Sequence, residues 1–133
     1  MEEVTNGNKW LHLSVKQENA IDSLVTGKTD AEVIPKPPWQ ERKKAYIQHL
    51  AEASPDTLLV SCCDKLHNSR AIVADLRELG DELWSRFKGG KDGTLWYYRA
   101  LVDAFRVHRA PPALLAELDR TVTEMEESAA IAK

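Results

Sequence analysis

The chain has little cysteine, no long apolar run and no excess of positive charge, and each absence excludes a class of protein. Only Cys62 and Cys63 among its 133 residues are cysteines, and adjacent cysteines cannot join separated segments by a disulfide. Both lie in an apolar stretch, so we expect two buried thiols rather than a metal or redox site. This cysteine usage fits a reducing compartment, and we expect a cytoplasmic protein.

Two further absences limit the partners of the chain. No apolar stretch approaches the roughly 20 residues that cross a bilayer, so we expect no membrane partner. The acidic beginning of the sequence, Met1–Thr5, lacks the apolar core of a secretory signal peptide. The net charge of −3 disfavours nucleic acid, because binding a phosphate backbone requires a basic surface. With 43% hydrophobic and 29% charged residues, the composition is typical of a globular domain.

Helical periodicity runs through most of the sequence, and no segment alternates with the two-residue period of a strand. Ser54 suits an N-cap and Pro55 the first helical position, so a long helix is predicted from there to Leu79, ended by Gly80. The other expected helices span 16–26, 39–53, 81–87, 95–107 and 113–125, with a proline-rich linker over 29–38 and a glycine loop over 89–93. These elements predict an all-α fold, an irregular helical bundle.

The helices are expected to form one domain. It covers residues 16–128, preceded by a divergent amino-terminal segment over 1–15 and followed by a short tail over 129–133. Within this domain, the charged run Glu41–Lys44 is expected to form a solvated helix face. The aromatic run Trp96–Tyr98 is expected to lie in the core rather than to form a stacking platform for bases.

A polar stripe crosses the most apolar part of the sequence. Asp64, Asn68 and Asp75 have i, i+4 and i+11 spacing, so they share one face of the long predicted helix. Burying a carboxylate is costly unless it is paired or bound to a metal. Asp64 is therefore expected to be either a metal ligand or an acid paired with a basic neighbour such as Lys65 or Arg70.

The segment Asp64-Lys65-Leu66-His67-Asn68 resembles the Asp-x-Leu-His-Asn motif of HD-domain metal-dependent phosphohydrolases. The likeness is strongest to the guanosine-tetraphosphate (ppGpp) hydrolases of the RelA/SpoT type and their small single-domain relatives. Flanking stretches that look like the same family are 37–43, 54–55, 58–61, 70–72 and 95–99. The resemblance covers roughly residues 20–125 and implies an all-helical fold similar to a truncated HD domain, its carboxyl-terminal part.

The resemblance also implies roles for individual residues. In that family a histidine, an adjacent His-Asp pair and a later aspartate hold the metal, and Asp64 matches the last of these. Asn68 matches an asparagine that lines the nucleotide pocket, with a structural hydrogen bond as its alternative role. Lys65 and Arg70 are further candidates for substrate binding, and no residue is assigned as catalytic.

The earlier ligands of the family have no counterpart in this sequence. No His-Asp pair precedes Asp64, and His12 is followed by Leu13 rather than by an aspartate. The residues before Lys16 are too few for the early helices of the family, so we do not expect those helices to form here. A catalytic divalent metal needs about three protein ligands and an open position for water. Asp64 is therefore expected to be a vestigial or weak metal ligand, and no cofactor is expected.

We therefore predict a non-catalytic, self-associating helical module derived from an HD-domain (p)ppGpp-hydrolase-like protein. Loss of the early helices would expose apolar surface on the long helix, and such surface is usually buried again. A homodimer with two-fold symmetry is the expected partner arrangement, and retained binding of a nucleotide or another partner stays open.

The alternative is a metal-dependent phosphohydrolase that acts on (p)ppGpp or another nucleotide. It would use Mn²⁺ or another divalent metal, which Asp64 would hold while Asn68 orients the substrate. The missing ligands would come from a second chain or from residues such as His12 and Asp30.

Overall fold

The computed structural model describes residues 38–132, and this part of the chain is mostly helical, without a strand. Its elements are α2 (Trp39–His49), the 3₁₀ helix η2 (Leu50–Glu52), α3 (Pro55–Leu79), the 3₁₀ helix η3 (Gly80–Arg86), α4 (Gly90–Val107) and α5 (Pro112–Ile131). The prediction of an all-α bundle is confirmed for these residues. The predictions for the segment 1–15, the helix 16–26 and most of the linker fall outside them.

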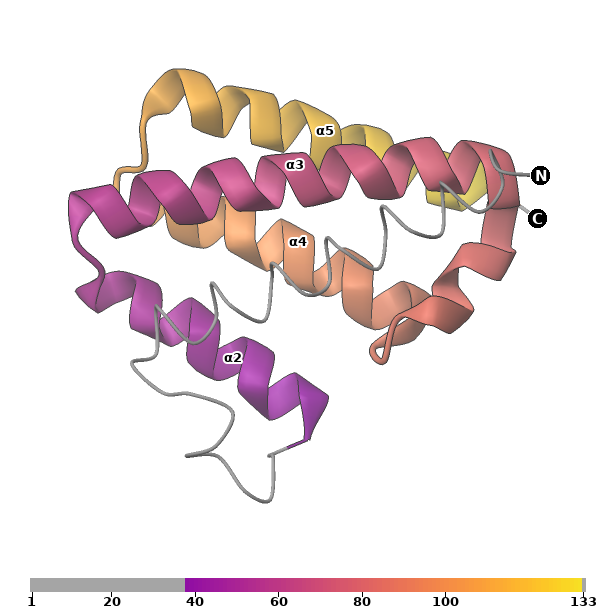
Figure 1. Cartoon of the computed structure of the whole chain (residues 1–133), viewed down its shortest axis with the longest axis horizontal. Helices are drawn as coiled ribbons and strands as arrows, with labels where there is room; N and C mark the ends of the chain where they lie inside the picture. Colours follow the sequence, from indigo (N-terminus) through magenta and orange to yellow (C-terminus); the bar gives the residue numbers. More distant parts are fainter. Residues whose placement is uncertain (1–37, 133) are drawn as a thin grey trace.

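The bundle is arranged around its longest helix. Figure 1 shows α3 and α5 side by side and running in the same direction, with α4 returning behind them and α2 lying across the beginning of α3. Within the described part, no helix combines the length and the apolar character that a bilayer crossing would require.

Both ends of α3 follow the sequence prediction. The Ser54 hydroxyl accepts a hydrogen bond from the Thr57 backbone N–H at 3.1 Å, and Pro55 occupies the first turn. At the other end, Gly80 has φ 64° and ψ −149°, a backbone conformation that is open essentially only to glycine. The chain can therefore leave α3 sharply and enter η3, which corresponds to the predicted short helix over 81–87.

The glycine loop predicted over 89–93 is wrong, because most of these residues form the first turn of α4, which begins at Gly90. The glycines serve close packing. A Cβ atom at Gly89 would lie 2.4 Å from the Trp39 ring, and one at Gly93 would lie 3.1 Å from it. The absence of side chains therefore lets α2 approach the start of α4.

Helix α5 packs along α3 through the face that the sequence predicts. Leu115, Leu118, Val122 and Met125 are buried, and the helix continues to Ile131 rather than ending at 125. The reason is that Ala129, one turn beyond Met125, is buried on the same face and extends the contact.

Ion pairs cross the two seams of α5. Arg99 of α4 donates to Asp119 at 2.8 Å, to Glu126 at 2.9 Å and to Thr123 at 3.1 Å. The hydrogen bonds to Glu126 and then to Asp119 raise the pKa of Arg99 above its ordinary value, and the bond from Arg99 holds the pKa of Asp119 below its ordinary value. The charges therefore tie α4 to α5 at neutral pH.

The two cysteines have different surroundings, which corrects the expectation of two buried thiols. Cys62 is fully buried, and burial, aided by the neighbouring Cys63, raises the pKa of its thiol to about 11. Cys63 is exposed. Successive residues of an α-helix are rotated by about 100°, so two adjacent side chains on one helix cannot both face the same core.

Candidate functional site

The predicted site lies on the inner face of α3, where this helix meets α2 and α4. Lys65 is fully buried, Asn68 is 2% exposed, and the Asp64 side chain is 10% exposed. At about 100° per residue, these three side chains span a sector of roughly 100° around the helix. They therefore share one buried face, as the spacing predicts for Asp64 and Asn68.

These side chains form one polar group around the Asp64 carboxylate. The Lys65 ammonium nitrogen lies 3.6 Å from Asp64 Oδ2, and the Asn68 amide donates to the same oxygen at 3.3 Å. A buried carboxylate and a buried ammonium at this distance stabilise each other, because water screens their attraction only weakly. Asp64 is thus a paired acid, one of the two roles that the sequence allows.

Among the described residues, two tyrosines lie close to the Lys65 ammonium. Its nitrogen lies 4.6 Å from the centroid of the Tyr46 ring and 5.6 Å from that of Tyr97. These distances allow cation–π attraction, which is stronger for a desolvated cation. The Tyr46 hydroxyl in turn shares a hydrogen bond with the hydroxyl of Ser61, one turn before Lys65 on α3.

Lys43 belongs to the same group, which corrects the prediction that Glu41–Lys44 is a solvated face. It is 2% exposed, and its ammonium nitrogen lies 4.9 Å from the centroid of the Tyr97 ring. The sequence does contain a signal for this position. Lys43 precedes Tyr46 by three residues and Leu50 by seven, which places all three on the buried face of α2.

Arg70 is not brought to this group. Its guanidinium lies 3.3 Å from a carboxylate oxygen of Glu117 on α5, and its side chain is 58% exposed. Six residues along α3 correspond to a rotation of about 240°, which carries Arg70 away from Asp64. Of the predicted substrate-binding residues, the structure brings Lys65 and Asn68 together and places Arg70 at the seam between α3 and α5.

The aromatic run is divided between the core and the surface. Tyr97 and Tyr98 are 2% and 3% exposed, as predicted, whereas Trp96 is 37% exposed. Tyr97 packs edge-on against Tyr46, with 6.4 Å between the ring centroids. Sequence reasoning assigned these tyrosines to the core but did not connect them with Lys65.

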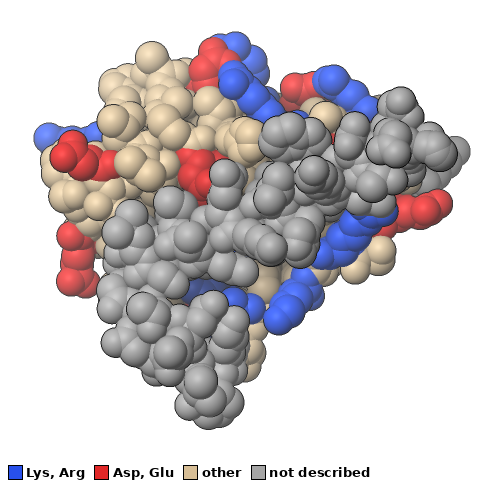
Figure 2. Space-filling model, viewed as in Figure 1, with Lys and Arg blue, Asp and Glu red and all other residues tan. Residues whose placement is uncertain are grey.

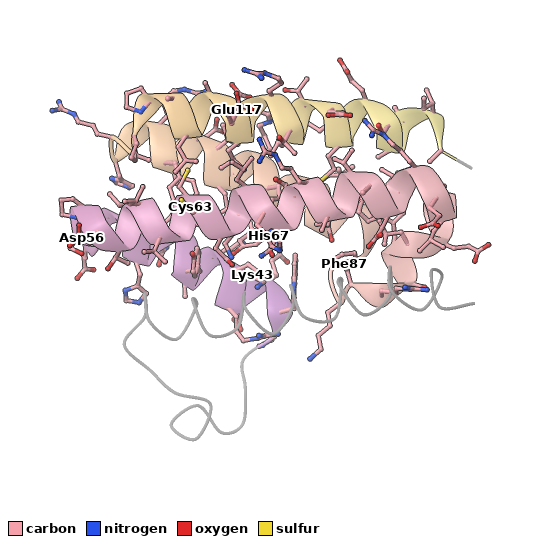
Figure 3. The ribbon with its side chains drawn as sticks, turned by 45° about the horizontal axis from the view of Figure 1, so that its top comes forward. Lys43, Asp56, Cys63, His67, Phe87 and Glu117 are labelled. Atoms are coloured by element: carbon pink, nitrogen blue, oxygen red, sulfur yellow. The ribbon has the colours of Figure 1, made fainter. Side chains whose placement is uncertain are left out.

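A metal centre of the HD type would require further donors close to Asp64. Within residues 38–132, no three His, Cys, Asp or Glu side chains come together in a way that could hold a metal ion. His67, in the same motif and labelled in Figure 3, is exposed, and its offset of three residues turns it about 60° from Asp64. His12 and Asp30 lie outside the described residues. The described donors therefore do not fit a catalytic divalent metal, which needs about three protein ligands.

The polar stripe ends at a second buried acid, Asp75, which is 7% exposed. Burial raises the pKa of this carboxyl, and the nearby Glu78 raises it further, whereas Arg86 lowers it. Within the described part of the chain, neither Oδ2 of Asp75 nor Oδ1 of Asn68 has a hydrogen-bond partner. Asp75 is thus buried without the pairing that Asp64 has with Lys65.

The arrangement offers charge compensation rather than a set of metal donors. Comparisons of the chain with protein-family models, with curated proteins and with solved structures found no match. The relation to HD hydrolases therefore depends on the motif residues alone and stays a prediction.

Proposed function

We propose that this chain is a non-catalytic, self-associating helical module derived from an HD-domain (p)ppGpp-hydrolase-like protein. The observation that carries the proposal is the fully buried Lys65 ammonium, 3.6 Å from the one carboxylate of the motif. In a working centre, this carboxylate would bind a divalent cation. In this chain it binds a protein cation from the next residue.

The charge of Lys65 disfavours metal binding at Asp64 and so supports a site without catalytic activity. A divalent ion bound by Asp64 would lie within a few ångströms of the Lys65 ammonium, and two cations at such a distance repel strongly in a buried environment. Breaking the existing pair would also leave a buried ammonium without this carboxylate, at a cost of about 3–5 kcal/mol. The pair thus favours a structural role for Asp64.

Exposed apolar residues on α3 support the self-association in this proposal. Leu59 is 42% exposed and Val60 is 46% exposed. At about 100° per residue, Leu59 lies on the side of α3 opposite to the polar group, and Val60 lies between that side and Asp64. Neighbouring apolar residues on one exposed face are typical of a surface that another protein covers.

The competing function is a metal-dependent phosphohydrolase whose ligands are completed by a second chain. One arrangement favours it: Asp64 and Asn68 lie within hydrogen-bonding distance, and Asn68 Oδ1 is buried without a partner among the described residues. This amide oxygen could accept a hydrogen bond from a nucleotide. Retained nucleotide binding without turnover is compatible with both functions.

The two functions differ in turnover and in metal content. Purified chain is incubated with Mn²⁺ and, in separate reactions, ppGpp, nucleoside triphosphates and a generic phosphodiester, beside Asp64→Ala and Asp64→Asn variants whose folding is checked by circular dichroism. We expect equal background rates for all three proteins and no stoichiometric metal after purification. Turnover that the Asp64 variants lose, together with retained Mn²⁺, Zn²⁺ or Fe, would establish the hydrolase instead.

A further inference from the structure

We propose that a second copy of this chain docks on the outer face of α3, antiparallel to it, with Cys63 of each copy at the two-fold axis. This inference rests on the self-association in the proposed function and names the surface that performs it. We call this surface the outer stripe: Leu59, Val60, Cys63 and His67, with Asp56 at one end and Arg70 at the other.

The members of the outer stripe are exposed and share one side of the helix. Leu59 and Val60 are 42% and 46% exposed, and the other members of the stripe are exposed as well. At about 100° per residue, the six side chains fall within a sector of roughly 100°. Figure 3 labels three of them along α3: Asp56, Cys63 and His67.

The surface around the outer stripe carries few charges. Figure 2 shows a largely uncharged area over the amino-terminal parts of α3 and α5, with acidic and basic side chains mainly at its edges. An uncharged area with charges at its edge has the composition of a protein–protein interface, apolar at the centre and polar at the rim.

The order of residues in the outer stripe makes it complementary to itself. Asp56 lies seven residues before Cys63 and Arg70 lies seven residues after it, while Leu59 and His67 lie four residues before and after. In an antiparallel pair centred on Cys63, Asp56 of each copy therefore faces Arg70 of the other. A two-fold axis makes both ion pairs at once, whereas a parallel pair would place like charges opposite each other.

The present partner of Arg70 does not prevent this arrangement. Arg70 pairs with Glu117 at 3.3 Å, and Glu117 also pairs with Arg120 at 3.0 Å. Arg70 can therefore turn toward Asp56 of the second copy without leaving Glu117 alone. The pair is at the surface, so its main contribution is to orientation rather than to affinity.

The geometry of paired helices provides a direct readout. Packed helix axes lie about 8–10 Å apart and Cα atoms lie about 2.3 Å from their axis, so facing Cα atoms are about 3.4–5.4 Å apart, and the wider part of this range suits a disulfide. The added oxidant diamide takes up the two protons and two electrons that the two Cys63 thiols release as the disulfide forms.

The test measures the dimer of the full chain by sedimentation equilibrium and its crosslinking with diamide. We expect a dimer in which Cys62→Ala still crosslinks and Cys63→Ala does not. Leu59→Lys should raise the dimer dissociation constant at least tenfold. Val107→Lys is the matched control, because Val107 is 71% exposed at the carboxyl end of α4 and does not belong to the outer stripe. Asp56→Arg and Arg70→Asp should each weaken the dimer, and the double variant should restore it.

The outcomes separate this inference from the proposed function. If Leu59→Lys leaves the dimer dissociation constant unchanged and Cys63 does not crosslink, the outer stripe is not the interface, but self-association still holds. A chain that stays monomeric at tens of micromolar would overturn both. A dimer that both single charge variants weaken, and that the double variant does not restore, would contradict the antiparallel register.

Discussion

The buried polar group of α3 depends on Lys65, whose ammonium balances the charge of the Asp64 carboxylate. Lys65→Met keeps an apolar stem of similar length but removes the charge that faces Asp64 and the rings of Tyr46 and Tyr97. We expect the free energy of unfolding to fall by about 3 kcal/mol, since removing one member of a buried ion pair is strongly destabilising. Urea denaturation followed by circular dichroism measures this change.

Arg77→Met serves as the control for this variant, because it removes an exposed ion pair with Glu124 outside the outer stripe and should cost less than about 1 kcal/mol. A double variant, Lys65→Met with Asp64→Leu, should recover much of the loss, since a buried apolar pair replaces a buried ion pair at little cost. Equal losses for Lys65→Met and Arg77→Met would contradict the structural role of Lys65.

Substitution of Asp75 is expected to raise the stability of the fold, whereas substitution of Lys65 lowers it. Burial raises its pKa, so the folded state is penalised for holding the ionised carboxylate. A carboxyl of this kind contributes stability at low pH that is lost as the pH rises through its folded-state pKa. Asp75→Asn should therefore stabilise the chain by about 1 kcal/mol at pH 7. The gain should shrink as the pH falls through that pKa, and a constant or reversed difference in urea titrations at several pH values would contradict this account.

Residue-level predictions from the sequence succeeded where helical spacing fixed a face. The spacing of Asp64 and Asn68 placed them on one buried side of α3, and the structure joins them by a hydrogen bond. Cys63 and Lys43 were misplaced because each was judged from its neighbours in the chain rather than from its angle around the helix. The tyrosines around Lys65 come from two other helices, so no local pattern could have indicated their contact.

At the scale of elements, the exit of α3 depends on one backbone conformation. Gly80 has φ 64° and ψ −149°, a region that costs a residue with a side chain about 1–3 kcal/mol. We expect Gly80→Ala to lower the free energy of unfolding by that amount and to leave the helical content unchanged. Thermal denaturation followed by circular dichroism at 222 nm measures both. An unchanged midpoint would contradict this prediction, because it would mean that the chain can pass from α3 to η3 in a backbone conformation open to alanine.

The seam between α4 and α5 should respond to acid through Asp119. Arg99 lowers the pKa of this carboxyl, so its contribution to stability is present above the ordinary pKa and is lost as the pH falls through the lowered one. Arg99→Met should cost about 1 kcal/mol at pH 7, because the pair is partly exposed. It should also make the acid limb of the stability curve shallower than in the wild type. A parallel acid limb would show that other carboxylates govern it.

Element boundaries were predictable where caps are local and failed where tertiary packing decides. Ser54, Pro55 and Gly80 each act within one turn, and all three marked the ends of α3 correctly. The glycines before Thr94 look like a loop in sequence, but they admit the Trp39 ring from another helix. The added length of α5 likewise comes from its contact with α3, which the sequence of α5 alone does not contain.

For the whole molecule, the helical class was predictable because periodicity, proline positions and the absence of alternating segments agree with one another. The candidate site was predictable only in part. The motif indicated which residues to inspect, including Lys65 as a partner of Asp64, but the tyrosine rings beside the Lys65 ammonium come from the folded arrangement of α2, α3 and α4. The relation to HD hydrolases and the two-fold dimer remain proposals that the experiments above address.

The central claim is that Asp64 belongs to a buried ion-pair network and does not bind a catalytic metal. Its most direct test is the Tm of the wild type and of Asp64→Asn, each with and without 1 mM Mn²⁺, with EDTA as the reference. A metal at 100 times its dissociation constant would stabilise the fold by about 2.7 kcal/mol, a shift of several degrees. We predict no Mn²⁺-dependent shift in either protein. A rise of several degrees in the wild type that Asp64→Asn abolishes would contradict the account.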